Sequence, residues 1–144
     1  MKITVAGDHY TVDVMRLIKD LLTAKDIIVD DYGTDDPDKK ISLQEIIPAV
    51  TKRVQSGEAD FGILACGTGV GVEIGANRFK GIRASLCRDA EQAKNARVYD
   101  DANVLCLGTW YKDDFEAILE AWLGNQFDGN EKRRQMLEDF DQLF

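Results

Sequence analysis

Short apolar runs alternate along this chain with longer segments in which hydrophobic side chains recur every three or four residues. The apolar runs are about five residues long and rich in Ile, Val, Leu and Ala, which is typical of strands buried on both faces. They predict strands at Lys2–Ala6, Ile27–Asp31, Phe61–Ala65, Ile82–Leu86 and Val104–Leu107.

The longer segments have the periodicity of amphipathic helices. In the first of them, Val14, Leu17, Ile18 and Leu21 fall on one face. The pattern predicts helices at Val12–Ala24, Leu43–Gln55, Asp89–Arg97 and Asp113–Leu123, followed by a charged C-terminal helix at Asn130–Phe144. Five alternations of strand and helix predict an α/β fold with a five-stranded parallel sheet and helices on both faces.

Length and charge restrict the class of protein. A chain of 144 residues fits one domain, 1–144, and its net charge of −8 argues against nucleic acid and anionic membranes as partners. No apolar run approaches the roughly 20 residues that span a bilayer. The first predicted strand begins already at Lys2, so no secretory signal is expected.

The cysteines and the single histidine indicate a reducing compartment, and they do not suggest a metal site. The three cysteines, Cys66, Cys87 and Cys106, are far apart and odd in number, which favours a cytoplasmic protein over a disulfide framework. His9 is the single histidine, and no close Cys/His pairs are present, so a metal site is not expected. Cys87 and Cys106 lie within or beside predicted strands and are expected in the core.

The segment Cys66-Gly67-Thr68-Gly69-Val70-Gly71 is the strongest chemical signal. It follows an apolar strand and precedes the start of a helix. Alternating glycines allow a tight turn and expose backbone N–H groups, and a helix start adds further donors, so such a loop suits an anion or an oxyanion. A thiol at its edge suits a base or a nucleophile. A tight turn around a buried cysteine is the alternative interpretation.

Three better-known loops are excluded by the sequence, two of them by position 72. A dinucleotide fingerprint needs Gly or Ala at position 72, and a cysteine phosphatase loop needs arginine there, whereas the residue is Val72. The Gly-Lys-Ser/Thr ending of a P-loop is also absent.

Other candidates follow the first and fourth strands. Asp8 and His9 come after the first strand, and Leu86–Asp89 follow the fourth. Ligands gather at the carboxyl ends of parallel strands, so these residues and Cys66 are expected to converge. For His9 a purely structural role is the alternative. The cluster Lys132-Arg133-Arg134 is the one compact basic patch, and by default it is a solvated helix face.

Six motifs occur in an order and at a spacing that resemble the ribose-5-phosphate isomerase type B family, which includes the two subunits of galactose-6-phosphate isomerase. They are Gly7-Asp8-His9, Gly57-Glu58-Ala59-Asp60, the Cys66–Gly71 loop, Ala76-Asn77-Arg78, Gly81-Ile82-Arg83-Ala84 and Asp101-Ala102-Asn103-Val104. The resemblance covers nearly the whole chain. It implies a Rossmann-like three-layer α/β/α subunit, a homodimer or homotetramer with active sites between two subunits, and no metal or other cofactor.

The resemblance also implies roles for single residues. Cys66 would take the proton from the carbon next to the carbonyl, and the N–H groups of Gly67, Gly69 and Gly71 would hold the enediolate oxygen. Thr68 would assist ring opening or proton relay, Asp8 would bind a sugar hydroxyl, and His9 would contact a hydroxyl or the phosphate. Asn77 would support the loop. The C-terminal helix of the neighbouring subunit would offer Arg133 and Arg134 to the phosphate.

Three positions depart from the family pattern. Tyr99, followed by Asp100, stands where ribose-phosphate isomerases usually carry the histidine that opens the sugar ring. Thr109-Trp110-Tyr111-Lys112 replaces a segment that usually includes an arginine, so Lys112, Arg133 and Arg134 are candidate replacements for the phosphate contacts. Arg88 and the altered C-terminal helix resemble the B-type subunit of galactose-6-phosphate isomerase.

The sequence therefore predicts an aldose–ketose isomerase of a phosphorylated sugar, with ribose 5-phosphate and ribulose 5-phosphate as the leading pair. Alternatives are a galactose 6-phosphate or tetrose phosphate substrate, or a subunit of a hetero-oligomeric galactose-6-phosphate isomerase. A subunit without catalytic activity is the remaining alternative, which the intact Cys66 loop argues against. If Tyr99 acts only as an acid, then Asp8, Thr68 or Asp100 would accept the other proton of ring opening.

Overall fold

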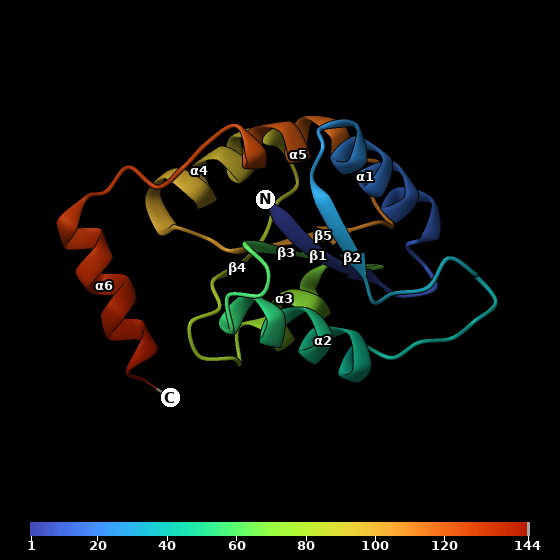
Figure 1. The fold of residues 1–144 in the computed structure, drawn as a ribbon, viewed down its shortest axis with the longest axis horizontal. Helices are drawn as coiled ribbons and strands as arrows, with labels where there is room; N and C mark the ends of the chain where they lie inside the picture. Colours follow the sequence, from blue (N-terminus) through green and yellow to red (C-terminus); the bar gives the residue numbers. More distant parts are fainter. Residues whose placement is uncertain (144) are drawn as a thin grey trace.

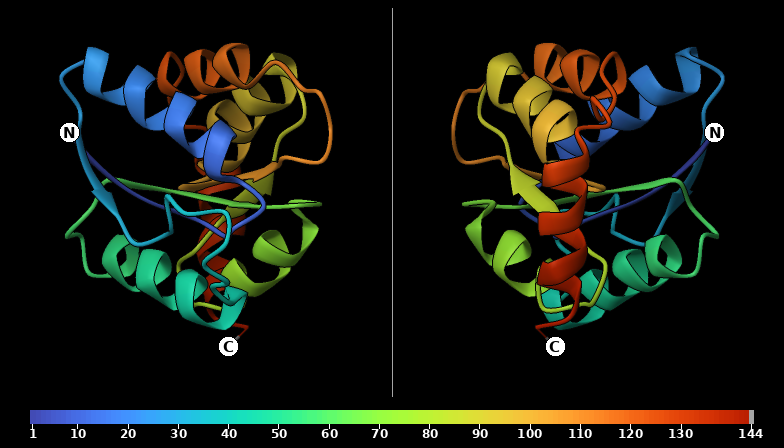
Figure 2. Two further views of the ribbon diagram at one scale, coloured as in Figure 1. Left: turned by 90° about the vertical axis from the view of Figure 1, so that its right-hand side faces the viewer. Right: turned by 90° about the vertical axis from the view of Figure 1, so that its left-hand side faces the viewer.

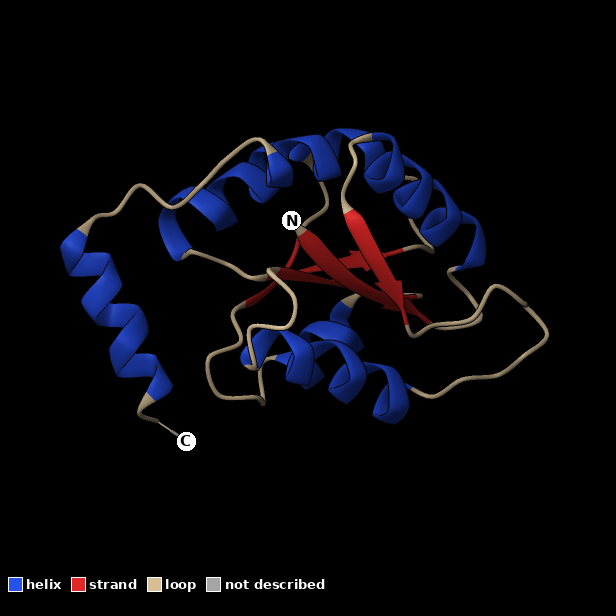
Figure 3. Cartoon of the chain, in the orientation of Figure 1, coloured by secondary structure: helices blue, strands red, loops and turns tan. Residues whose placement is uncertain are grey.

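A five-stranded sheet forms the centre of the computed structural model, which describes residues 1–143. The strand order is β2-β1-β3-β5-β4, and every neighbouring pair is parallel (Figure 3). The strands are β1 (Lys2–Gly7), β2 (Ile28–Asp31), β3 (Phe61–Cys66), β4 (Ala84–Leu86) and β5 (Val104–Gly108). The predicted parallel α/β sheet is confirmed.

Six helices connect and follow these strands. They are α1 (Val12–Ala24), α2 (Leu43–Gln55), α3 (Val70–Ala76), α4 (Ala90–Asp100), α5 (Phe115–Leu123) and α6 (Glu131–Asp141). The first two have the predicted bounds. The start of α2 is fixed by a capping box, since the Ser42 hydroxyl accepts from the Glu45 N–H at 3.2 Å and donates to the Glu45 carboxylate at 3.1 Å.

The helices form a layer on each face of the sheet, as the three-layer prediction requires (Figures 1 and 2). Helices α1, α4 and α5 cover one face, over a core that includes Ile63, Leu105 and Trp122. Helices α2 and α3 cover the other face, over Leu64, Val104 and Cys106. Successive residues of β3 and β5 thus alternate between two cores, which explains their continuous apolar runs.

Helix α6 lies apart from both layers. It runs beside the sheet next to β4, from the layer of α4 and α5 toward the layer of α2 (Figure 2). Only Leu137 is buried within this helix, while Phe140 is 50% exposed. The C-terminal helix was predicted at Asn130–Phe144, but Asn130 caps it from outside and the helix ends at Asp141. Phe144 lies outside the described residues.

Three other predicted bounds were wrong by two or three residues. Helix α5 begins at Phe115 rather than Asp113, because Asp114 caps it from outside. The fourth strand begins at Ala84 rather than Ile82, because the Ile82 N–H is used in a turn to the Phe79 carbonyl. Helix α4 continues to Asp100 rather than ending at Arg97, and Asp101 ends it in the left-handed conformation with a φ of 46°. Tyr99 and Asp100 therefore belong to the last turn of a helix.

The chain changes direction in the sheet between β1 and β3. From β1 the chain passes to β2 on one side and later to β3 on the other. The carboxyl ends of these two strands meet at that point, where the Asp8 N–H donates to the Ala65 carbonyl at 3.3 Å. Crevices at such switch points are the usual ligand sites of open α/β sheets.

Candidate active site

Cys66 ends β3 at the carboxyl edge of the sheet. Its side chain is only 5% exposed, and its Sγ accepts a hydrogen bond from the Gly69 N–H at 3.2 Å. The Cys66 carbonyl accepts from the Thr109 N–H at 3.0 Å, which ties the loop to the end of β5. The Gly69 N–H thus fixes the position of the sulfur at the start of the glycine loop.

The glycines of the loop are required by its geometry. Gly69 has a φ of 76°, and a Cβ there would lie 2.5 Å from Leu86 Cδ1 and 2.8 Å from the Gly108 nitrogen. A Cβ on Gly67 would lie 2.3 Å from the Trp110 ring. Within residues 1–143 the N–H groups of Gly67 and Thr68 have no acceptor, so they are available to a bound oxyanion.

Thr68 lies at the top of this loop, where its side chain is half-buried. Its Oγ1 accepts a hydrogen bond from the Val70 N–H at 3.2 Å. That bond fixes the oxygen at the start of α3 and leaves the hydroxyl hydrogen to donate to another group. Thr68 therefore keeps a hydroxyl hydrogen that it can donate to a ligand.

Asp8 faces the same edge from the end of β1. Its side chain is buried, and its Oδ1 accepts from the Tyr10 N–H at 3.0 Å. Burial raises the pKa of the Asp8 carboxyl above its ordinary value, while the Tyr10 hydrogen bond and the neighbouring His9 oppose that shift. One carboxylate oxygen is committed to the turn, and the other remains to accept from a ligand hydroxyl.

His9 follows in the same turn and is half-buried. Its Nδ1 accepts from the Ile41 N–H at 3.4 Å, so the ring is tied to the loop before α2. Its ring centroid lies 4.4 Å from that of Tyr10. With its Nδ1 acting as an acceptor, neutral His9 carries its proton on Nε2, which is free to donate to an anion or a hydroxyl.

Cys87 and Cys106 are buried in the core, as predicted. Burial raises the pKa of both thiols, that of Cys106 strongly. They stay protonated and packed against neighbouring side chains, which leaves Cys66 as the candidate thiol.

The remaining predicted site residues lie elsewhere in the chain. Tyr99 is in the last turn of α4, and the Arg133 guanidinium lies 4.9 Å from the centre of its ring. Arg133 also pairs with Asp128. Arg134 pairs with Glu131 at 3.6 Å and lies over the ring of Phe127.

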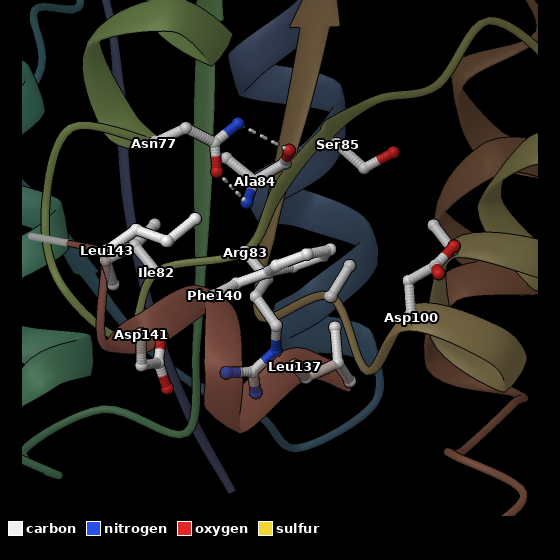
Figure 4. A pocket seen from close by; sticks show the side chains of 12 residues that line it. Asn77, Ile82, Arg83, Ala84, Ser85, Asp100, Leu137, Phe140, Asp141 and Leu143 are labelled. Carbon is white, nitrogen blue, oxygen red and sulfur yellow. Dashed lines mark hydrogen bonds between the residues drawn. The ribbon is translucent and has the colours of Figure 1, made fainter. Parts of the chain in front are cut away.

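Asn77 ends α3 and supports β4 rather than the glycine loop of the same protomer. Its amide nitrogen donates to the Ala84 carbonyl at 2.9 Å, and its Oδ1 accepts from the Ala84 N–H at 2.8 Å (Figure 4). Asn77 and Asp100 line a cavity of about 390 Å³ between β4 and α6. Figure 4 shows Phe140 and Leu137 on the α6 side of this cavity.

The predicted site residues thus form two groups, one at each end of the parallel strands. These two ends are the carboxyl edge and the amino edge of the sheet. Cys66, Thr68, Asp8 and His9 lie at the carboxyl edge. Tyr99, Asp100, Asn77 and the two arginines lie at the amino edge, because α3 and α4 return the chain to the start of the next strand. In Figure 1 α6 is on the left, whereas the β2 arrow points toward the lower right, away from α6. β3 is six residues long, so about 20 Å separates the two edges.

Two further properties concern metals and membranes. Residues 1–143 contain no group of three or more His, Cys, Asp or Glu side chains arranged to hold a metal ion. Within the same residues, no helix has the length and apolar composition needed to cross a bilayer.

Comparison with known families identifies the class of this protein. The ribose/galactose isomerase family matches residues 3–138, which include both groups of site residues. The chain belongs to that family. It is an aldose–ketose isomerase of sugar phosphates, with a fold that the family shares.

The similarity to individual members extends over most of each protein. Ribose-5-phosphate isomerase B of Escherichia coli is 34% identical over 94% of this chain and 91% of its own length. Galactose-6-phosphate isomerase subunit LacB of Clostridium acetobutylicum is 34% identical, covering 99% and 83% respectively. D-erythrulose-4-phosphate isomerase 2 of Mycolicibacterium smegmatis is also 34% identical, covering 89% and 87%.

The crystal structure of a ribose 5-phosphate isomerase from Thermotoga maritima superimposes on this chain with a TM-score of 0.91. The sequences are 35% identical, and the match covers 98% of this chain and 97% of the other. The aldose–ketose isomerase fold is therefore shared in full, whereas the three relatives above act on different sugars by name.

Sequence reasoning missed the aromatic residues at the carboxyl edge of this isomerase. Trp110 and Tyr10 are each 61% exposed, and their rings meet edge to face with centroids 5.7 Å apart. The available signal was the position of Trp110 just after the fifth strand, in the segment that replaces the usual arginine. Nearby, Arg88 pairs with Asp113 at 2.9 Å and lies over Tyr111.

Proposed function

We propose that Cys66 is the base that moves a proton between C1 and C2 of an open-chain sugar phosphate. The thiolate takes the proton from C2 of the aldose, and the electrons of that C–H bond form a C1–C2 double bond while the carbonyl oxygen becomes an oxyanion. The thiol then returns the proton to C1. A hydroxyl proton moves from O2 to O1, which completes the ketose without any cofactor.

The observation that carries this proposal is the geometry of the Cys66–Gly71 loop. The Gly69 N–H faces the sulfur at 3.2 Å, while the N–H groups of Gly67 and Thr68 have no acceptor within residues 1–143. One set of backbone donors thus suits the thiolate and another suits the enediolate oxygen. Preorganised donors of this kind commonly contribute the largest share of transition-state stabilisation.

The surrounding side chains have roles that fit an open-chain sugar. Asp8 accepts a hydrogen bond from a sugar hydroxyl through its free carboxylate oxygen. Thr68 carries the proton between O1 and O2. His9, which lies beyond Tyr10 from the loop, contacts a distal hydroxyl or the phosphate.

Two copies of the chain complete each site in this proposal. Tyr99, Asp100, Arg133 and Arg134 lie at the edge opposite Cys66, so one protomer cannot bring both groups to one ligand. In a dimer, α6 and the end of α4 of one copy reach the carboxyl edge of the other. The small buried area of α6 and its exposed Phe140 support this role, because such a helix buries little of its apolar surface within residues 1–143.

Ribose 5-phosphate is the leading substrate, and a tetrose phosphate is the second candidate. The second is favoured by Tyr99, which stands where the ring-opening histidine is usual. A phenol is a weak base at neutral pH, whereas an imidazole both gives and takes a proton there. A tetrose phosphate cannot close a stable five-membered ring through its phosphorylated oxygen, so it needs no such group.

The experiment is isomerisation in deuterium oxide with ribose 5-phosphate and erythrose 4-phosphate. We expect deuterium at C1 of the ketose formed by the wild type. Cys66→Ala should lower turnover by about 10²–10⁴-fold, and Cys66→Ser should retain slight activity. Cys87→Ala, which removes a buried thiol that is not part of the Cys66–Gly71 loop, should remain active. Turnover near the wild-type rate in Cys66→Ala would refute the assignment, and Glu73 would be the next base to test.

A further inference from the structure

A continuous row of contacts joins the catalytic loop to His9 through two aromatic rings. The Trp110 indole covers Gly67 so closely that a Cβ there would lie 2.3 Å from it. The Trp110 and Tyr10 rings meet edge to face with their centroids 5.7 Å apart, and the Tyr10 and His9 ring centroids are 4.4 Å apart. Neither Trp110 nor Tyr10 has a part in the proton transfers described above.

The backbone on both sides holds the Trp110 ring in place. Its N–H donates to the Gly67 carbonyl at 2.9 Å, and the hydroxyl of the preceding Thr109 donates to the Tyr10 carbonyl at 3.3 Å. Gly67 lies directly beneath the ring, so its backbone blocks movement of the indole toward the protein interior. The Trp110 side chain is therefore held in position, and it is 61% exposed. It forms a rigid aromatic wall that faces the solvent.

This wall lies along the path of the substrate if the proposed function holds. The reacting carbons lie over the N–H groups of Gly67 and Thr68, and the far end of the sugar reaches toward His9. The contacts from Gly67 to Trp110, Tyr10 and His9 join these two points. In this pose the carbon chain between C2 and the phosphate passes along the indole.

We propose that Trp110 is a specificity-determining residue that limits the length of the sugar phosphate accepted by the enzyme. A rigid aromatic side chain leaves less room than a small one, so each added carbon must displace the ring or bend around it. One carbon more or less against an apolar wall commonly changes kcat/KM by about 10–200-fold. The wall favours shorter sugars over longer ones.

The test compares kcat/KM for erythrose 4-phosphate, ribose 5-phosphate and a hexose 6-phosphate in matched variants. Trp110→Ala should raise the hexose-to-tetrose ratio by about tenfold or more. Trp110→Phe, which keeps a smaller ring, should raise it less. Tyr111→Ala is the control, because Tyr111 is a neighbouring exposed aromatic residue that contacts Arg88 instead of Tyr10, and its ratio should match that of the wild type.

The outcomes separate this inference from the proposed function. A wild type that isomerises none of the three sugars refutes the function itself. A wild type that is active, with an unchanged ratio in both Trp110→Ala and Trp110→Phe, refutes the wall. A ratio that shifts equally in Tyr111→Ala also refutes it. Thermal unfolding identifies a variant that fails to fold, and Trp110→Phe then carries the test alone.

Discussion

Gly69→Ala tests the geometry of the loop, and its cost follows from two separate terms. The first is backbone strain, because the φ of 76° costs an L-residue about 1–2 kcal/mol. The second is a collision, since a Cβ would lie 2.5 Å from Leu86 Cδ1 and 2.8 and 2.9 Å from backbone atoms of Gly108 and Leu107. A side chain can turn aside, but β5 cannot move without disturbing the sheet.

Gly57 provides the matched control for the strain alone. Its φ is 78°, and a Cβ there would meet nothing within 4 Å. Gly57→Ala should therefore lower the free energy of unfolding by about 1–2 kcal/mol and leave kcat unchanged. Overpacking adds about 1–3 kcal/mol, so Gly69→Ala should lose about 2–5 kcal/mol in total.

Activity should separate these two variants further. A misplacement of about 1 Å near the reacting atoms costs on the order of 10²-fold in rate, and Gly69 supplies the N–H that faces Cys66 Sγ. The assays are urea unfolding at one fixed protein concentration and kcat for the preferred sugar phosphate. A Gly69→Ala variant as stable and as active as Gly57→Ala would refute the reasoning.

Two further predictions concern Asp8 and Tyr99. Burial raises the pKa of Asp8 in the folded state. Between the ordinary carboxyl pKa and this raised pKa, the folded protein therefore binds more protons than the unfolded chain. The free energy of unfolding falls as pH rises through that window. Asp8→Asn keeps an acceptor for the Tyr10 N–H, so urea unfolding should show that this variant is more stable than the wild type at pH 7. The gain in the free energy of unfolding should vanish toward about pH 4. The kcat of the variant should fall. A variant less stable at pH 7 would contradict this. Tyr99→His should raise kcat/KM for ribose 5-phosphate relative to erythrose 4-phosphate; a decrease would mean that Tyr99 is itself competent in ring opening.

The fold could be predicted wherever local signals agree with one another. In α2, hydrophobic periodicity and the Ser42–Glu45 capping box indicate the same start, and the predicted bounds are those observed. In β4, an apolar residue misled the prediction, because Ile82 fits a strand by composition but is committed to a turn. The end of α4 depends on Asp101, which adopts the left-handed conformation. The pattern of apolar residues does not predict this conformation.

The candidate site was predictable where it is local and unpredictable where it depends on distant contacts. The glycine pattern around Cys66 predicts an anion-binding loop, and within residues 1–143 the N–H groups of Gly67 and Thr68 have no acceptor. The Trp110 wall depends on contacts with Gly67 and Tyr10, which are remote in sequence. Asn77 was expected to support the loop, whereas α3 carries it to the opposite edge, where it fixes Ala84.

The central claim is that Cys66 of one subunit works with the arginines of another, and subunit complementation tests it most directly. Cys66→Ala and the double variant Arg133→Ala/Arg134→Ala, each nearly inactive at low substrate concentration, are co-expressed with different tags, and the mixed dimer is purified through both. A two-fold interface then leaves one site intact, so the mixed dimer should have about half of the wild-type kcat/KM.

The control pairs Cys66→Ala with Asp8→Asn. Both substitutions lie in the same half of the site, so every site of that mixed dimer carries one defect and activity should stay low. Recovery in the first mixed dimer and none in the control is the result that the interfacial account predicts. If the first mixed dimer is no more active than its parents, Cys66 and the two arginines do not meet across a subunit interface, and the account is contradicted.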